Sequence, residues 1–113
     1  MTLKLFACGD IVNLRSKKDF VDEKIKNLIQ SSDISICNFE APIETNNMKA
    51  IKKAGPHVYQ SKKSIEYLSE AGFNMVSLAN NHIYDYGQES LDNTIVELNK
   101  YNIDIIGAGF DFD

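Results

Sequence analysis

Short apolar stretches alternate with amphipathic stretches along this chain. Four strands are expected where apolar and β-branched residues follow one another closely, at residues 2–7, 33–37, 74–79 and 103–106. Three helices are expected where apolar residues recur every three or four positions, at residues 19–30, 62–71 and 88–100. Strands that alternate with helices form parallel sheets through right-handed crossovers. The pattern therefore predicts an α/β fold, a parallel sheet with helices covering both of its faces.

Residues 41–59 break this pattern. They contain Pro42, the pair Gly55–Pro56 and several lysines, which are typical of loops. We expect a mobile excursion here, with a short extended piece at 57–59. After it, Ser61 is expected to cap the next helix and Gly72 to end it in the left-handed conformation.

Length and composition are those of one soluble domain. The chain has 113 residues, 43% of them hydrophobic and 25% charged, with a formal net charge of −4. We expect a single domain over residues 1–113, without nucleic acid as partner, because nucleic acid selects a basic surface. No apolar run approaches the about 18 residues of a membrane helix. Leu5–Cys8 superficially resembles a lipoprotein cleavage site, but the apolar segment before it is too short, so the chain as it stands is expected in the cytoplasm.

The richest polar stretch is residues 78–87. An apolar run ends there abruptly and is followed by Asn80, Asn81, His82 and Asp85. One interpretation is a buried strand that delivers polar side chains to the edge of a sheet, where ligands bind. The alternative is a turn, because Asn, Asp and Gly tolerate unusual backbone angles.

Polar side chains also follow the first two expected strands. Asp10 comes after the first, and Asn38 and Glu40 come after the second. The carboxyl ends of parallel strands share one rim, so these residues are expected to meet Asn81 and His82 there. Together they offer oxygen and imidazole ligands suited to Mn, Fe, Zn or Mg, and such a site can activate water for hydrolysis. His82 could act as general acid with Asp85 orienting its ring, or could be a structural histidine bonded to a loop carbonyl.

Other candidates are weaker. His57 is interpreted as a solvated loop histidine, and Lys49, Lys52 and Lys53 as a solvated surface that could attract an anion. Residues 107–109, Gly-Ala-Gly, could let backbone amides approach an anion. Cys8 and Cys37 are expected to be buried thiols, with a disulfide between neighbouring strands as the alternative.

Several of these segments together resemble one protein family. Gly9–Asp10, residues 38–43, the Leu-Ala-Asn-Asn-His stretch at 78–82, residues 85–87 and residues 107–109 are similar to bacterial capsule-synthesis proteins of the poly-gamma-glutamate (CapA-like) type. That family resembles a branch of the calcineurin-like metallophosphoesterases. The resemblance implies Asp10, Glu40 and Asn81 as metal ligands, His82 as the residue that assists the leaving group, and Asp85 as its partner. Asn38 and Asn80 would be further rim residues.

The chain departs from the metallophosphoesterase pattern in two ways. Val12 stands where those enzymes have a histidine, so the first metal position would be altered. The resemblance also implies a four-layer sandwich, of which this chain covers the first half, without the later histidine ligands. The expected function is capsule biosynthesis with an incomplete phosphoesterase-type site acting on a phosphoester or anionic polymer; the alternatives are a non-catalytic scaffold whose site is unused and a generic small-molecule binding domain. A half sandwich leaves one face uncovered, so a homodimer or a covering partner is expected.

Overall fold

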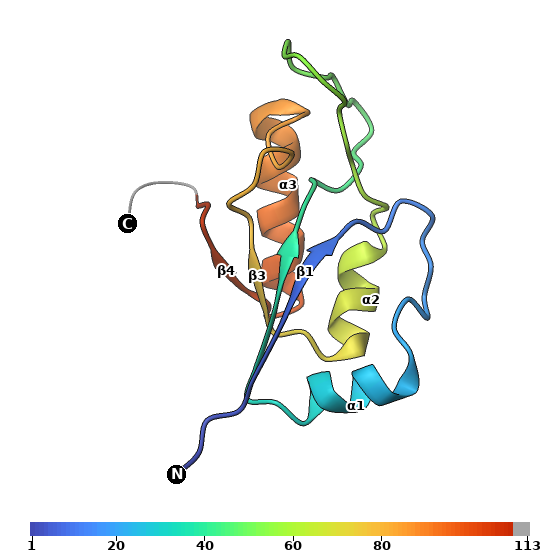
Figure 1. Ribbon diagram of the computed structural model, residues 1–113. Helices are drawn as coiled ribbons and strands as arrows, with labels where there is room; N and C mark the ends of the chain where they lie inside the picture. Colours follow the sequence, from blue (N-terminus) through green and yellow to red (C-terminus); the bar gives the residue numbers. More distant parts are fainter. Residues whose placement is uncertain (110–113) are drawn as a thin grey trace.

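The computed structural model describes residues 1–109 and confirms the α/β class (Figure 1). The elements in chain order are β1 (Leu5–Ile11), α1 (Glu23–Gln30), β2 (Ile34–Phe39), α2 (Ser64–Ala71), β3 (Met75–Ser77), α3 (Gly87–Lys100) and β4 (Asp104–Ile106). Each element overlaps its predicted range, but the bounds differ. β1 and β2 extend beyond the expected ends, α1 begins four residues later than expected, and β3 is shorter than the expected strand at 74–79. The last four residues of the domain expected over 1–113 lie outside the described range.

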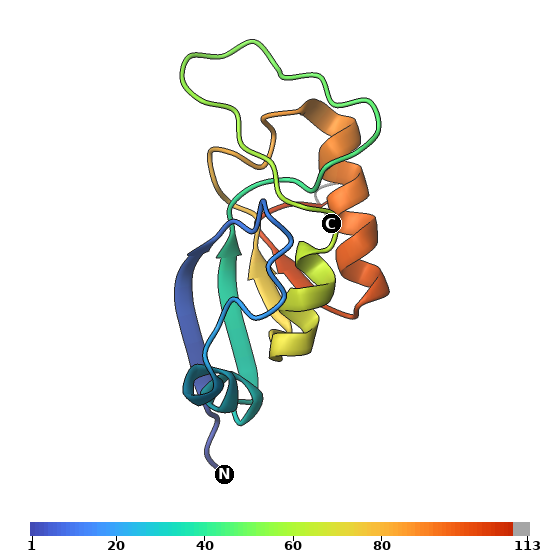
Figure 2. The ribbon, with the colours of Figure 1, turned by 90° about the vertical axis from the view of Figure 1, so that its right-hand side faces the viewer.

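The four strands are all parallel and lie in the order β1-β2-β3-β4. When neighbouring strands follow each other in sequence and every crossover is right-handed, all the helices pack on the same face. Figures 1 and 2 show this arrangement. The expectation of helices on both faces is therefore not met by the part of the chain that the structure describes.

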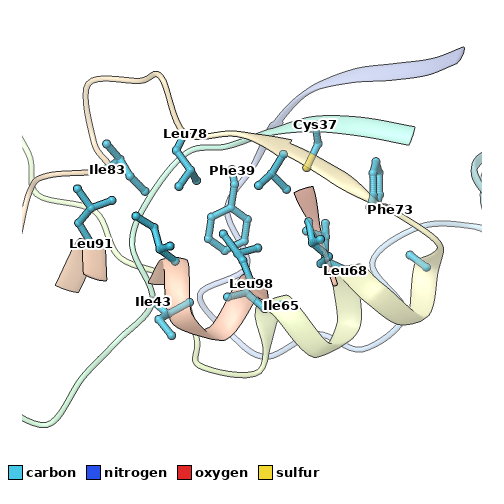
Figure 3. Close-up of a cluster of buried hydrophobic side chains, with 14 of the residues drawn as sticks. Cys37, Phe39, Ile43, Ile65, Leu68, Phe73, Leu78, Ile83, Leu91 and Leu98 are labelled. Atoms are coloured by element: carbon cyan, nitrogen blue, oxygen red, sulfur yellow. The ribbon is translucent and has the colours of Figure 1, made fainter. Parts of the chain in front are cut away.

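The core lies between the sheet and its helices (Figure 3). Phe39 from β2, Val76 from β3, Leu68 from α2 and Leu98 from α3 are all completely buried in it. Phe6 on the edge strand β1 packs edge-to-face on Phe73, with ring centroids 6.1 Å apart. Cys37 is buried in this core, as expected, whereas Cys8 is exposed, and both are free thiols. The disulfide alternative is therefore wrong in this structure.

Local signals explain where the helices begin and end. Asp22 caps α1, because its side chain accepts a hydrogen bond from the Ile25 amide at 2.9 Å. Gly72 ends α2 at φ 105°, which confirms the predicted left-handed stop. Ser61 does not cap α2 directly; its hydroxyl accepts at 3.2 Å from the amide of Lys63, the residue just before the helix starts.

The second face of the sheet carries apolar side chains. Leu5 is 62% exposed there and Ile106 is 47% exposed, and their strands form the two edges of the sheet. Ile34 and Ile36 on β2 lie between them, level with Leu5 and Ala7 of β1, and are only partly buried. Within residues 1–109, no helix is long and apolar enough to cross a membrane.

A bulge in β1 sets the direction of Asp10. Ala7 pairs with Ile36, but Asp10 pairs with Asn38, so β1 has one extra residue between these pairs. Without that residue Asp10 would lie level with Phe39, whose side chain points into the core. The bulge turns Asp10 away from the core and beside Asn38, which is why the carboxylate reaches the rim.

Candidate functional site

The predicted rim residues meet at the carboxyl ends of β1, β2 and β3. The side-chain amide of Asn38 donates to Asp10 Oδ1 at 2.6 Å, and its oxygen accepts from Asn80 Nδ2 at 3.1 Å. Residues from three strands, far apart in sequence, thus form one chain of hydrogen bonds. A turn alone does not account for this meeting, although Asn80 also has a turn role, since its Oδ1 accepts from the His82 amide at 3.1 Å.

Asp10 and Glu40 form a pair of neighbouring carboxyl groups. Burial, together with hydrogen bonding to Asp10 and its negative charge, raises the pKa of Glu40, while the charge of His82 opposes this. Hydrogen bonds with Asn38 and Glu40 lower the pKa of Asp10. Two neighbouring carboxylates repel each other, and a cation bound between them relieves that repulsion.

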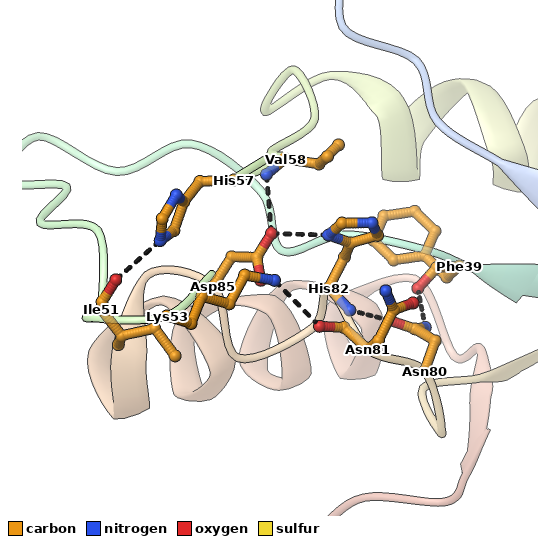
Figure 4. Close-up of polar contacts among 9 residues, drawn as sticks. All are labelled: Phe39, Ile51, Lys53, His57, Val58, Asn80, Asn81, His82 and Asp85. Carbon is orange, nitrogen blue, oxygen red and sulfur yellow. Dashed lines mark hydrogen bonds and ion pairs between the residues drawn. The ribbon is translucent and has the colours of Figure 1, made fainter. Parts of the chain in front are cut away.

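His82 and Asp85 form a hydrogen-bonded pair within the loop between β3 and α3 (Figure 4). His82 Nδ1 lies 2.7 Å from Asp85 Oδ2, and a carboxylate accepts, so Nδ1 is the protonated ring nitrogen. The Asp85 side chain is only 1% exposed. The structure thus places the predicted orienting carboxylate in contact with the ring.

Asp85 is a buried carboxylate with several donors. Burial alone would raise its pKa, but hydrogen bonds from Lys53, the Val58 amide and His82, together with the charge of Lys53, outweigh burial and lower the pKa below its ordinary value. The Val58 amide donates to Asp85 Oδ2 at 2.7 Å. The carboxylate therefore remains ionised, which suits a group that holds a histidine in one orientation.

Lys53 and Val58 were not predicted as site residues. Both belong to the 44–59 segment, defined here as the chain between Ile43 and Gln60, which form an isolated parallel bridge. Sequence alone does not separate Lys53 from its neighbours Lys49 and Lys52. Only the packing of this segment shows which lysine reaches the site.

The interpretation of His57 as a solvated histidine is wrong. Its ring is partly buried, and His57 Nε2 lies 2.6 Å from the Ile51 carbonyl oxygen. It also packs edge-to-face on Tyr86, with centroids 6.1 Å apart. His57 thus supports the 44–59 segment from within.

Two further predicted positions, Asn81 and Gly107, have backbone roles near the loop that follows β3. The Asn81 side chain is exposed at the rim, and its backbone carbonyl accepts from Lys53 Nζ at 3.3 Å. Gly107 has φ 85°, and a Cβ there would lie 2.6 Å from the Cβ of Ala79. The glycine is needed for close packing against the strand that leads into the site, a structural use that the Gly-Ala-Gly pattern did not predict.

The donor set fits a divalent cation in part. Asp10 and Glu40 supply two carboxylates, and Asn38 and Asn80 supply amide groups in the hydrogen-bonded chain that ends on Asp10. Over the described range of the chain, no three His, Cys, Asp or Glu side chains come together closely enough to hold a metal ion. The carboxylate pair can therefore hold a cation only with the help of amide oxygens, water or ligands from elsewhere.

Comparison with known proteins gives a consistent result. The model of a family described as bacterial capsule synthesis protein PGA_cap matches residues 4–113. The capsule biosynthesis protein CapA of Bacillus anthracis is 34% identical over 105 residues, covering 91% of this chain and 25% of the relative. The PGA biosynthesis protein CapA of Bacillus subtilis (strain 168) is 33% identical over 94 residues, covering 81% of this chain and 24% of the relative. The chain spans about a quarter of the length of these curated relatives.

Proposed function

The chain belongs to the bacterial capsule synthesis protein family PGA_cap, and on this basis we propose that it serves poly-gamma-glutamate capsule synthesis through a metal-dependent, phosphoesterase-type site. The site is incomplete in this chain and takes a phosphoester or an anionic polymer. The single observation that supports it most is that hydrogen bonds link the Asp10 carboxylate through Asn38 and Asn80 to the backbone amide of His82, whose ring is bound by Asp85. Hydrolysis needs such a combination of anionic ligands and a proton carrier.

Each residue has a distinct task in this proposal. Asp10, Glu40 and Asn81 would hold the cation, which would supply Lewis-acid chemistry by lowering the pKa of a water molecule and neutralising phosphoryl charge. Asp85 keeps the His82 ring oriented with the proton on Nδ1, which leaves Nε2 for contact with the substrate. A protonated His82 then donates its Nε2 proton to the leaving-group oxygen.

A second candidate is a non-catalytic partner or scaffold domain with the same rim. It is favoured by the small number of anionic metal ligands at the rim. Among the described residues only two neighbouring carboxylates, Asp10 and Glu40, lie there, and no group of three His, Cys, Asp or Glu side chains could hold a metal ion. Metal affinity separates the two candidates. A scaffold has no need to bind a cation tightly, whereas a hydrolytic site does.

The Asp10→Asn variant is expected to bind Mn²⁺ at least about tenfold more weakly than the wild type, because an amide replaces one of two carboxylate ligands. Titration calorimetry on the metal-free chain measures the affinity. Asp19→Asn is the matched control, because Asp19 is exposed and lies outside the rim. Absence of Mn²⁺ binding in the wild type, or equal affinity in both variants, would favour the scaffold.

We also propose that the second face of the sheet is covered by a second copy of the chain or by a partner protein. Leu5, Ile36 and Ile106 form an apolar surface on strands whose opposite face is already packed against helices. Large exposed apolar patches are uncommon on monomers and mark interaction sites. β1 also leaves an unpaired strand edge, which adds a reason for cover.

The Leu5→Glu variant is expected to shift the purified chain from dimer to monomer, because the new charge would be buried on association. Light scattering after size exclusion measures the mass. Leu28→Glu is the control, since Leu28 is 53% exposed on α1 and lies away from this face. A monomeric wild type would count against the second copy and leave the partner protein as the covering element.

A further inference from the structure

The buried Asp85 carboxylate has one charged partner from outside its own loop. The Lys53 ammonium group forms an ion pair with Asp85 Oδ1. Among the described residues, Oδ1 has no other polar partner. The remaining donors, the Val58 amide and His82 Nδ1, both bind Oδ2.

Lys53 also contacts the residue before His82. Its Nζ donates to the Asn81 carbonyl at 3.3 Å. One ammonium group thus joins two points of the same loop, the Asn81 carbonyl and the Asp85 carboxylate (Figure 4). Removing the charge would leave the 1% exposed carboxylate without its counter-ion.

The segment that carries Lys53 is docked on the same loop at further points. The Ile51 amide donates to the Asp85 carbonyl at 2.8 Å. Tyr59 packs edge-to-face on Tyr86, with centroids 5.8 Å apart, next to the contact of His57 with the same ring. These contacts place Lys53 and leave its side chain 23% exposed.

We propose that Lys53 is a positioning residue of this site, whose ammonium group fixes Asp85 and Asn81 relative to each other and thereby orients the His82 ring. The catalytic part of this inference rests on the proposed function; the anchoring part does not. A lysine suits the task because its flexible stem lets a compact charge reach a carboxylate and a carbonyl at once. Lys53 acts through Asp85, so its loss should affect turnover more than substrate binding.

Three variants test the inference. Lys53→Met removes the charge and keeps the length of the stem, Lys53→Arg keeps the charge, and Lys52→Met removes the charge of an exposed neighbour. The Nδ1 proton of His82 gives an NMR signal only while a hydrogen bond protects it from exchange. We expect this signal in the wild type, Lys53→Arg and Lys52→Met, and its loss in Lys53→Met.

Two further measurements accompany the signal. Amide hydrogen exchange at Val58 should be at least about tenfold faster in Lys53→Met than in Lys52→Met, because Asp85 holds that amide. Hydrolysis of p-nitrophenyl phosphate with Mn²⁺ should show kcat lower by about tenfold or more in Lys53→Met, with KM little changed and kcat largely restored in Lys53→Arg.

The outcomes are distinguishable. An unchanged His82 signal or unchanged Val58 exchange in Lys53→Met overturns the proposal. A normal kcat in Lys53→Met, with an active wild type, also overturns it. If every variant is inactive but only Lys53→Met loses the signal, the anchoring role is supported and the phosphoesterase function is rejected for this chain.

Discussion

Replacing His82 by alanine is expected to lower kcat for Mn²⁺-dependent hydrolysis of p-nitrophenyl phosphate by about a hundred- to a thousandfold, the usual contribution of a general acid. The ring is held through Nδ1 by Asp85, so only Nε2 is free to transfer a proton. Alanine removes the proton carrier and leaves Asp10 and Glu40 unchanged. Mn²⁺ affinity should therefore stay close to the wild-type value while turnover falls.

His57→Gln is the matched control for this prediction. His57 is the other histidine of the chain, and a glutamine amide can still donate to the Ile51 carbonyl. Turnover in this variant should remain near that of the wild type. Equal turnover in His82→Ala and the wild type would show that His82 is not the general acid, and a wild type without activity would favour the scaffold function.

Most of the fold could be predicted because local signals agree with the tertiary structure. The helix at 88–100 is predicted from the spacing of Leu91, Ile95 and Leu98, and these side chains are buried in the core. Gly72 is predicted as a helix stop from its position alone. Local signals could not predict which face of the sheet each helix covers. That choice depends on the order of the strands, which is set by contacts between residues far apart in sequence.

The residues of the candidate site likewise include some that the sequence predicts and some that depend on tertiary contacts. Asp10 and Asn38 lie near the carboxyl ends of their strands and Asn80 follows β3, so parallel topology brings them to one rim. The β1 bulge that turns Asp10 outward leaves no clear sequence signal apart from Gly9. Lys53 was missed because it lies on a segment without periodicity, where the position of a side chain depends on tertiary contacts of that segment.

Replacing Asp85 by alanine is expected to lower the free energy of unfolding by about 3–4 kcal/mol, as is usual when one partner of a buried ion pair is removed. The Lys53 ammonium group and the Val58 amide would lose their acceptor. For a domain of this size the loss corresponds to a fall in Tm of about 10–20 °C. Asp92→Ala is the control, since among residues 1–109 Asp92 on α3 accepts only from Gln88, at 2.7 Å, and it should change stability by less than about 0.5 kcal/mol.

The wild type and the Asp85→Ala variant also test whether Asp85 is ionised in the folded protein. Its pKa is lowered from an ordinary value of 3.8, so the unfolded chain takes up this proton at higher pH than the folded chain does. The stabilisation is therefore complete well above pH 3.8 and is lost as pH falls through the lower pKa of the folded state. The difference in unfolding free energy between the wild type and Asp85→Ala, measured by urea denaturation, should be constant above about pH 5 and shrink as the pH falls towards 3. A difference that instead grows on acidification would mean that Asp85 is protonated in the folded protein, and then Lys53 could not be its ion-pair partner.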